Sequence, residues 1–461
     1  MLNLFEVKNI YFLGIGGIGM SALAHFFLRR GCAVYGYDLT PSHVTDMLQQ
    51  EGAQIHFEEN VAQIPKDLDF VVFTPAIPKN HTEYLYFQEK KMPILKRSQV
   101  LGLICKNFTT IAVAGTHGKT TTTALITHLL HPENPIISFI GGIANNFKNN
   151  FVVDDSPKTA VVEADEFDRS FLTLFPNIAV ITSIDADHLD VYGDGDALRD
   201  TFQLFANQVD KNGALIIHEK VANQIKHPRK VVYGCGETAD YQVRNVQLFH
   251  NRSIFDLYYH GNLIYKSVVL GVSGLHNVQN AVAAFASVFE RISFLSHIDK
   301  RECDFHSIVA KAAEFKGVAR RFDIRIERED FVYIDDYAHH PEEIKSFLSA
   351  IKKIFPKRKV VGVFQPHLYS RTRDFAHQFA ETLTNLDYLI LLEIYPAREK
   401  PIPGITSDYL LSLVPHDRKI LLQKQELIPY LKKINPEVLL TIGAGDIDRF
   451  VPQIEDAFSL K

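Results

Sequence analysis

Thr109-Thr-Ile-Ala-Val-Ala114 is followed at once by Gly115-Thr-His-Gly-Lys-Thr120 and then by a helix-like run over 120–130. The first six residues are apolar or β-branched, which predicts a buried strand. Glycines after such a strand let backbone N–H groups turn towards a phosphate, and the N-terminus of the next helix adds its dipole. The stretch therefore predicts a strand, a phosphate-binding loop and a helix at the centre of an α/β domain.

The loop departs from the usual eight-residue phosphate-binding pattern, because Val113 stands where that pattern has its first glycine. Lys119 still supplies a positive charge for the phosphates, and the hydroxyl of Thr120 is suited to a Mg²⁺ ion that bridges them. The helix opens on four threonines, 120–123, which are poor helix formers and gain most from a ligand. A plain turn between strand and helix is the alternative.

The chain as a whole has the composition of an ordinary globular protein. It has 461 residues, 46% of them hydrophobic and 22% charged, a length that favours two to four domains, with three as our working number. Its net charge is −5 and it contains no basic block, which argues against binding to nucleic acid or to a membrane surface. We therefore expect small-molecule ligands.

The sequence also favours the cytoplasm. Its four cysteines are scattered and form no C-x-x-C pair, so neither a disulfide framework nor a zinc cluster is expected. The first residues lack the apolar core of a signal peptide, and no apolar run reaches the roughly 18 residues needed to span a bilayer. The oligomeric state stays open between monomer and homodimer.

Strand and helix patterns alternate along most of the chain. Residues 10–106 alternate short apolar runs with helical segments, which predicts a parallel sheet with crossover helices. Between Tyr241 and Leu270, His-Asn and His-Gly-Asn turns predict antiparallel hairpins appended to the central domain. From about Arg321 the strand and helix rhythm returns. The predicted fold class is therefore α/β.

A second glycine loop lies near the N-terminus. Gly14-Ile-Gly16-Gly-Ile-Gly19 follows a predicted strand and opens a helix, and Asp38 ends the next strand about twenty residues on. Such glycines allow a diphosphate to approach a helix N-terminus, and the carboxylate is suited to a ribose hydroxyl. NAD and a UDP-sugar both fit this pattern, and a purely structural turn is the third alternative.

Acidic side chains follow two apolar strands of the central domain. Glu163-Ala-Asp165-Glu166 comes after one strand and Asp187-His188-Leu-Asp190 after the other. Because the carboxyl ends of parallel strands share one edge with the phosphate loop, we expect Glu163 and His188 to converge on a metal-nucleotide. Taken singly, each cluster also fits solvated turn acids.

Polar runs also follow predicted strands in the last third of the chain. They are Asp335-Asp-Tyr337-Ala-His339-His340-Pro341 and Gln365-Pro-His367-Leu-Tyr-Ser-Arg371-Thr-Arg373-Asp374. Histidine and arginine at such positions suit carboxylate and phosphate recognition, whereas capping and surface ion pairs are the plainer alternative. His276-Asn277-Val-Gln-Asn280 precedes an alanine-rich helix, which its amides are suited to cap.

In this combination and order, the phosphate loop, the acidic clusters, His276–Asn280 and the two polar runs resemble the Mur ligases, the cytoplasmic enzymes of peptidoglycan precursor synthesis. The resemblance spans the whole chain. It is strongest to the branch that joins L-alanine to UDP-N-acetylmuramate, because of Gly14–Ser21, the Thr116-His117 form of the loop and Gln365–Asp374.

The resemblance implies three domains. They are a Rossmann-like domain for the UDP-sugar at 1–106, a central P-loop-type ATPase domain with an appended antiparallel sheet at 107–318, and a C-terminal doubly wound α/β domain for the amino acid at 319–461. It also implies the substrates UDP-N-acetylmuramate, L-alanine and ATP, Mg²⁺ as a cofactor, and an acyl-phosphate intermediate.

Roles for individual residues follow from the same resemblance. The implied catalytic residues are Lys119, Glu163, His188, His339 and Arg371, and the implied metal ligands are Thr120, Glu163 and His188. ATP contacts are implied for Gly115, Thr116, His117, Gly118, Lys119, Thr120, Thr121, Asn277, Asn280 and Arg321. UDP-sugar contacts are implied for Gly14, Gly16, Gly17, Gly19, Met20, Ser21 and Asp38, and amino-acid contacts for Tyr337, His339, His367 and Arg371.

Two departures from the family pattern are visible. No lysine occurs between Lys158 and Lys211, so we expect no carbamylated lysine of the kind that several sister ligases carry. Leu368 stands where this branch often has arginine. The alternatives are a ligase that attaches a ready-made tripeptide to the same sugar, a nicotinamide oxidoreductase suggested by the first glycine loop, and a nucleotide switch suggested by the second.

Overall fold

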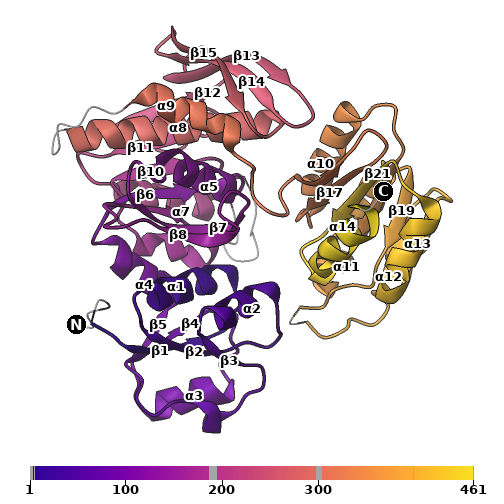
Figure 1. Ribbon diagram of the computed structural model, residues 1–461, viewed down its shortest axis with the longest axis horizontal. Coiled ribbons are helices and arrows are strands. Elements are labelled where there is room, and N and C mark those ends of the chain that lie inside the picture. Colours follow the sequence, from indigo (N-terminus) through magenta and orange to yellow (C-terminus); the bar gives the residue numbers. More distant parts are fainter. Residues whose placement is uncertain (1–3, 5, 186–194, 297–303, 398, 460–461) are drawn as a thin grey trace. The chain divides into compact units, whose positions relative to one another are not determined.

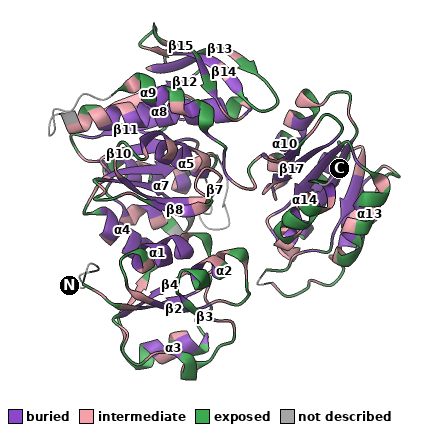
Figure 2. Cartoon of the chain, viewed as in Figure 1, coloured by how far each residue is buried: buried purple, intermediate pink, exposed green. Residues whose placement is uncertain are grey.

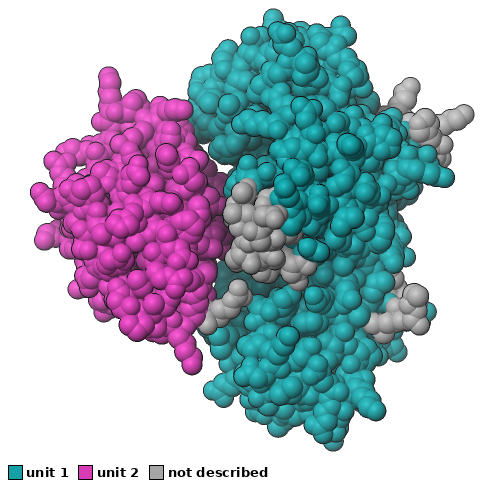
Figure 3. All heavy atoms as spheres, turned by 180° about the vertical axis from the view of Figure 1, so that it is seen from behind, with its two compact units in different colours: residues 1–317 teal, residues 318–461 magenta. Residues whose placement is uncertain are grey.

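Three α/β domains, each built on its own sheet, follow one another along the chain in the computed structural model (Figure 1). The structure describes residues 4, 6–185, 195–296, 304–397 and 399–459. Its two compact units are 1–317, which holds the first two domains, and 318–461, which holds the third (Figure 3). The predicted α/β class with three domains is confirmed. No helix among the described residues is long and apolar enough to cross a membrane.

The N-terminal domain is a five-stranded parallel sheet in the order β3-β2-β1-β4-β5. The strand order reverses between β1 and β4, and ligands bind outside the carboxyl ends of strands at such a point. Helices α1, α2 and α4 pack on one face of the sheet, and α3 packs on the other. The elements are β1 Asn9–Leu13, α1 Ile18–Arg29, β2 Ala33–Tyr37, α2 His43–Gln50, β3 Gln54–His56, η1 Val61–Gln63, β4 Phe70–Phe73, α3 Thr82–Glu89, β5 Ile94–Lys96 and α4 Arg97–Cys105.

The central domain holds a ten-stranded sheet in the order β15-β14-β13-β12-β11-β10-β6-β9-β7-β8. Seven strands, β6, β7 and β9–β13, run parallel to one another. The first of its elements are β6 Thr109–Ala114, α5 Lys119–Leu130, β7 Ile136–Ala144, β8 Asn149–Val153, β9 Thr159–Glu163, η2 Phe167–Thr173, β10 Ile178–Ile181, α7 Gly195–Asn207, β11 Ala214–His218 and β12 Lys230–Gly234. Figure 2 shows that the parallel strands are largely buried.

The predicted antiparallel hairpins are present at one end of this sheet. Strands β13, β14 and β15 pair antiparallel, and β13 is hydrogen-bonded to β12. They therefore extend the central sheet and do not form a separate one. The remaining elements are β13 Tyr241–Leu248, β14 Ser253–Tyr259, β15 Asn262–Leu270, α8 Leu275–Ser296, α9 Phe305–Lys311 and η3 Ala312–Glu314.

The N-terminal and central domains share one hydrophobic cluster. The ring of Phe26 in α1 lies 6.1 Å from that of Phe139 in β7 and 6.4 Å from that of Phe151 in β8. The buried amide of Asn150 donates beside them to Ile18 O (2.6 Å) and to Ser21 Oγ (2.9 Å). Burial of apolar and polar groups across this interface explains why the two domains form one compact unit.

The C-terminal domain is a six-stranded sheet in the order β16-β17-β21-β18-β19-β20. The edge strand β16 is antiparallel and the others are parallel. Helices α10–α12 pack on one face and α13 and α14 on the other, so the predicted doubly wound arrangement is confirmed. The elements are β16 Asp323–Glu327, β17 Val332–Asp336, α10 Pro341–Ile354, β18 Val360–Phe364, α11 Tyr369–Leu383, β19 Tyr388–Leu391, α12 Ser407–Leu413, β20 Lys419–Leu421, η4 Lys424–Glu426, α13 Leu427–Ile434, β21 Val438–Ile442, η5 Asp446–Phe450 and α14 Val451–Ser459.

Candidate active site

The phosphate loop leads from β6 into α5, as the sequence predicts. Gly115 and Gly118 both have positive φ, 132° and 81°, which favours glycine. A Cβ on Gly115 would lie 2.1 Å from Thr182 Oγ1, and one on Gly118 would lie 2.6 Å from Asn280 Oδ1. These two positions therefore require glycine. Val113, which departs from the usual loop pattern, lies within β6 and pairs with β9.

The segment that follows β10 holds this loop in place. Ser183 O accepts from Thr116 N (3.2 Å), and Ser183 Oγ accepts from His117 N (2.9 Å). Thr182 Oγ1 donates to Ala114 O and to His117 O. The His117 ring lies 3.7 Å from the carboxylate of Asp185. Sequence reasoning missed Thr182 and Ser183, although two hydroxyl residues directly after a buried strand were the available signal.

Lys119, the first residue of α5, turns back onto the loop. Its Nζ donates to Gly115 O (2.6 Å) and to Glu166 Oε1 (2.9 Å). Burial opposes the charged amine, but the carboxylates of Glu166 and Glu163 outweigh burial, so the pKa of Lys119 is raised. Burial also raises the pKa of Glu166. The loop thus keeps a charged ammonium at the place where phosphates are expected.

Oxygen ligands suited to Mg²⁺ lie on two elements next to this ammonium. Thr120 is buried in the first turn of α5, and Thr121 beside it is half-buried. Glu163 ends β9, where its carboxylate accepts from Gly141 N (3.2 Å). A hydroxyl and a carboxylate fit the preference of Mg²⁺ for oxygen. The third predicted ligand, His188, lies outside the described residues, which contain no group of three acidic, histidine or cysteine side chains arranged for a metal.

The two asparagines predicted to contact ATP lie at the start of α8 but differ in their surroundings. Asn280 Oδ1 reaches the phosphate loop at Gly118. The amide nitrogen of Asn277 donates to Ser273 O (2.7 Å), four residues earlier in the chain. The structure therefore brings Asn280, rather than Asn277, to the phosphate loop.

The N-terminal glycine loop is hydrogen-bonded to Asp38, the acid that follows β2. Gly14 has a φ of 85°, and its N–H donates to Tyr37 O (2.8 Å). Asp38 Oδ2 accepts from Gly16 N (2.7 Å), and burial raises the pKa of that carboxyl. Gly17 is the residue that precedes α1. Asp38 thus supports the loop directly, and its contact with a ribose stays a prediction.

Of three further predicted sugar contacts, Met20 and Ser21 are buried and Gly19 is half-buried. The side chains of Met20 and Ser21 are buried, 2% and 0% exposed, at the interface with the central domain. Gly19 lies against Arg97, whose Cδ would be 2.9 Å from a Cβ at that position. Arg97 in turn lies 3.5 Å from Asp165 in the acidic segment after β9. Sequence analysis missed this arginine, which follows β5 directly.

In the C-terminal domain the predicted amino-acid contacts lie together. The rings of His339 and His367 are 6.1 Å apart, and Arg371 Nη1 is 3.2 Å from His367 Nδ1. The Tyr337 ring packs beneath the guanidinium of Arg321, 5.4 Å from its centre. The cluster combines imidazole, guanidinium and phenol groups at the carboxyl ends of β17 and β18, which suits binding of a carboxylate.

Neighbouring groups fix the protonation and position of this cluster. Burial lowers the pKa of His339, and its Nδ1 lies 3.0 Å from Tyr337 O. Nδ1 therefore carries the proton and Nε2 is the acceptor. Glu343 accepts from the backbone N–H of His339 (3.0 Å). Burial raises the pKa of Glu343, but His339, Arg321 and the backbone N–H groups of His339 and His340 together outweigh burial, so this pKa is lowered. Leu368 precedes α11 with a φ of 73° and donates its N–H to Tyr395 O.

Comparison with known proteins places these features in one family. The Mur ligase family catalytic domain matches residues 9–109, the Mur ligase middle domain 113–288, and the Mur ligase glutamate ligase domain 320–445. The chain is 46% identical to a UDP-N-acetylmuramate--L-alanine ligase of Flavobacterium psychrophilum, over 98% of this chain and 99% of that protein. The chain belongs to the Mur ligase family. The resemblance inferred from the sequence is confirmed.

Other Mur ligases show the same relation. A relative from Cytophaga hutchinsonii with the same name is 43% identical over 98% of this chain and 97% of its own. The crystal structure of the UDP-N-acetylmuramate-alanine ligase of Thermotoga maritima has a TM-score of 0.82 and 28% identity, covering 99% of this chain and 100% of that one. A murein peptide ligase of Psychrobacter arcticus has a TM-score of 0.69 at 21% identity, covers 98% of this chain and 99% of its own, and shows the shared fold.

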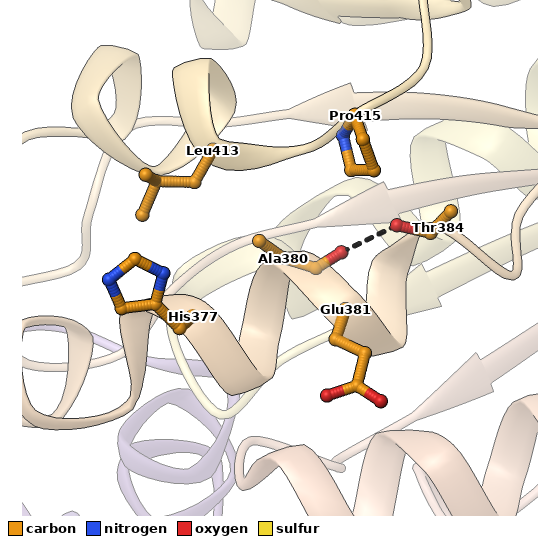
Figure 4. A pocket seen from close by; sticks show the side chains of 6 residues that line it. All are labelled: His377, Ala380, Glu381, Thr384, Leu413 and Pro415. Carbon is orange, nitrogen blue, oxygen red and sulfur yellow. Dashed lines mark hydrogen bonds between the residues drawn. The ribbon is translucent and has the colours of Figure 1, made fainter.

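A separate hollow of about 350 Å³ lies in the C-terminal domain of this Mur ligase, between α11 and the end of α12 (Figure 4). Thr384 Oγ1 donates there to Ala380 O (2.8 Å), which is an ordinary intrahelical contact. Among the described residues, no predicted site residue lines it, and we assign it no chemistry. The lining residues are His377, Ala380, Glu381, Thr384, Leu413 and Pro415.

Proposed function

We propose that this chain joins L-alanine to the lactyl carboxylate of UDP-N-acetylmuramate with hydrolysis of ATP to ADP, in the cytoplasmic synthesis of peptidoglycan precursors. The observation that carries the proposal is the 40–46% identity, over nearly the full length of both chains, to relatives named UDP-N-acetylmuramate--L-alanine ligase. The phosphate loop around Lys119 supplies the site for ATP that such a reaction needs.

The proposal assigns one substrate to each domain. Residues 1–106 would bind the UDP-sugar, 107–318 ATP, and 319–461 the amino acid. Two glycine loops in the first two domains, each between a parallel strand and a helix, support the first two assignments. The cluster of His339, His367 and Arg371 supports the third.

The first chemical step activates the sugar carboxylate. A free carboxylate is a poor acyl donor, so one of its oxygens attacks the γ-phosphorus of ATP, ADP leaves, and an acyl phosphate forms. Lys119, held by Gly115 and Glu166, stabilises the negative charge that moves onto the leaving oxygen. One Mg²⁺ held by Thr120 and Glu163, and a second held by His188, would neutralise the phosphate charge.

The second step forms the amide. The neutral amine of L-alanine attacks the acyl carbon, the tetrahedral intermediate collapses, and inorganic phosphate leaves. His339 is assigned to accept the proton that the amine loses, because its Nε2 is the acceptor atom of a neutral ring. Arg371, already in contact with His367, is assigned to the carboxylate of the amino acid.

Phosphate release tests this function. The enzyme is incubated with UDP-N-acetylmuramate and ATP, and L-alanine, glycine, L-serine or a murein tripeptide is offered in turn. We expect release that requires the sugar and is fastest with L-alanine. Release with the tripeptide alone would reassign the chain to tripeptide ligation, and release without the sugar would leave only a nucleotide hydrolase.

A further inference from the structure

We propose that Glu166 is a positioning residue for the reaction and acts through Lys119. The inference rests on the proposed use of ATP at this loop. Glu166 Oε1 binds the Lys119 ammonium at 2.9 Å, and Gly115 O takes a second proton of the same group at 2.6 Å. Among the described residues these contacts occupy two of the three N–H groups, which leaves the third for a phosphate oxygen.

The burial of this pair distinguishes it from an ordinary surface ion pair. The Lys119 side chain is 14% exposed and that of Glu166 only 1%. A lysine on a flexible four-carbon chain binds phosphate as a point charge, so its contribution depends on where Nζ is held before the nucleotide arrives. Glu166 and the loop carbonyl fix that position at the N-terminus of α5, in a site with little competing water.

Three acids at the end of β9 and directly after it have different partners, which indicates different roles. Glu163 accepts from Gly141 N (3.2 Å), so its carboxylate lies over β7. Asp165 lies 3.5 Å from Arg97, in the N-terminal domain. Glu166 is the acid in hydrogen-bond contact with Lys119 among the residues that the structure describes. Glu163 is thus suited to bind a metal ion, whereas Glu166 is suited to position Lys119.

The test is a double-mutant cycle on ATP affinity, measured by titration calorimetry on the full chain without sugar or alanine. Glu166→Gln keeps the shape of the side chain but removes its charge. Loss of one charge-assisted hydrogen bond predicts ATP binding weaker by about 10-fold to 100-fold in the native background. In a Lys119→Ala background the same change is expected to produce no weakening, because the residue through which Glu166 acts is gone.

Asp165→Asn is the matched control, because it removes the same charge one residue away and leaves the Lys119 contact intact. We expect it to change ATP affinity by less than about fivefold. In turnover, Glu166→Gln is expected to raise the KM for ATP and lower kcat while the KM for L-alanine stays unchanged. Thermal melts of each variant identify loss of folding, and Glu166→Asp, which keeps the charge, is expected to restore part of the affinity.

Equal weakening by Glu166→Gln in both backgrounds would make Glu166 a purely structural residue and overturn the inference, as would native affinity in Glu166→Gln. If Glu166→Gln does not fold, Glu166→Asp is measured in both backgrounds, and equal weakening in the two backgrounds overturns the inference. An unmodified chain that binds no ATP would instead refute the proposed function, so the two failures are distinguishable.

Discussion

Replacement of Gly115 by alanine is expected to disrupt the proposed ATP site through the backbone of the loop. A Cβ there would lie 2.1 Å from Thr182 Oγ1 and 2.9 Å from Ser183 N, and rotation of a side chain does not relieve contact with a backbone atom. A non-glycine residue at φ 132° costs about 1–3 kcal/mol. Loss of the Thr182 bonds to Ala114 O and His117 O adds about 1 kcal/mol each. We expect a total destabilisation of about 3–5 kcal/mol.

Gly31→Ala separates backbone strain from collision. Gly31 also has a positive φ, 78°, but a Cβ there meets no atom of the described residues within 4 Å. Its expected cost is about 1–2 kcal/mol, with unchanged ATP affinity. Thermal unfolding and ATP titration are measured for both variants, and Gly115→Ala is expected to bind ATP at least about tenfold more weakly, a loss of about 1.4 kcal/mol. Equal shifts in Tm together with native ATP affinity in Gly115→Ala would refute this account of the loop.

Three further predictions concern charge, the domain interface and pH. Lys119→Ala and Glu163→Ala are each expected to abolish alanine-dependent phosphate release and keep a native circular dichroism spectrum; near-normal turnover in either would refute the site assignment. Asn150→Ala removes two hydrogen bonds across the interface, of which the one to Ser21 is buried, and should lower stability by about 1–3 kcal/mol in urea unfolding; an unchanged midpoint would contradict the importance of this contact. The pKa of Glu343 is lowered from 4.5, so its charge stabilises the fold above that pH, and the stabilisation is lost as pH falls through the folded pKa. The decrease in Tm caused by Glu343→Gln should therefore be full at neutral pH and smaller in acid. A decrease that does not depend on pH would contradict this assignment.

Local sequence patterns were sufficient to predict the three α/β domains and the phosphate loop. The phosphate loop at Gly115–Thr120 can be recognised from sequence, because the strand, the glycines and the helix lie next to one another in the chain. The same holds for Tyr241–Leu270, where turn residues between strands predicted the hairpins. The continuity of these hairpins with the central sheet was not predictable, because a short stretch of sequence does not show which distant strand it pairs with.

The partners of the site residues depend on long-range contacts and were not predicted. The sequence placed Glu163 and Glu166 in one acidic cluster, but only the fold shows that Glu166 binds Lys119, 47 positions away in the chain. Asn150 was missed because its partner Ile18 is 132 positions away. Met20 was predicted as a sugar contact from its place after a glycine loop, whereas its side chain lies in the core. Local sequence patterns identified the loops, but they did not show which way the side chains of those loops point.

The hydrophobic cluster that joins the first two domains has a consequence for how the chain is divided. Phe26, Phe139 and Phe151 belong to one core, so a chimaera joined near residue 106 would expose aromatic surface on both fragments. Residues 318–461 contain both of their own hydrophobic clusters. A junction at 317/318 keeps each of these described clusters whole, so exchange of residues 318–461 between members of the family is the way to test the proposal that this domain binds the amino acid.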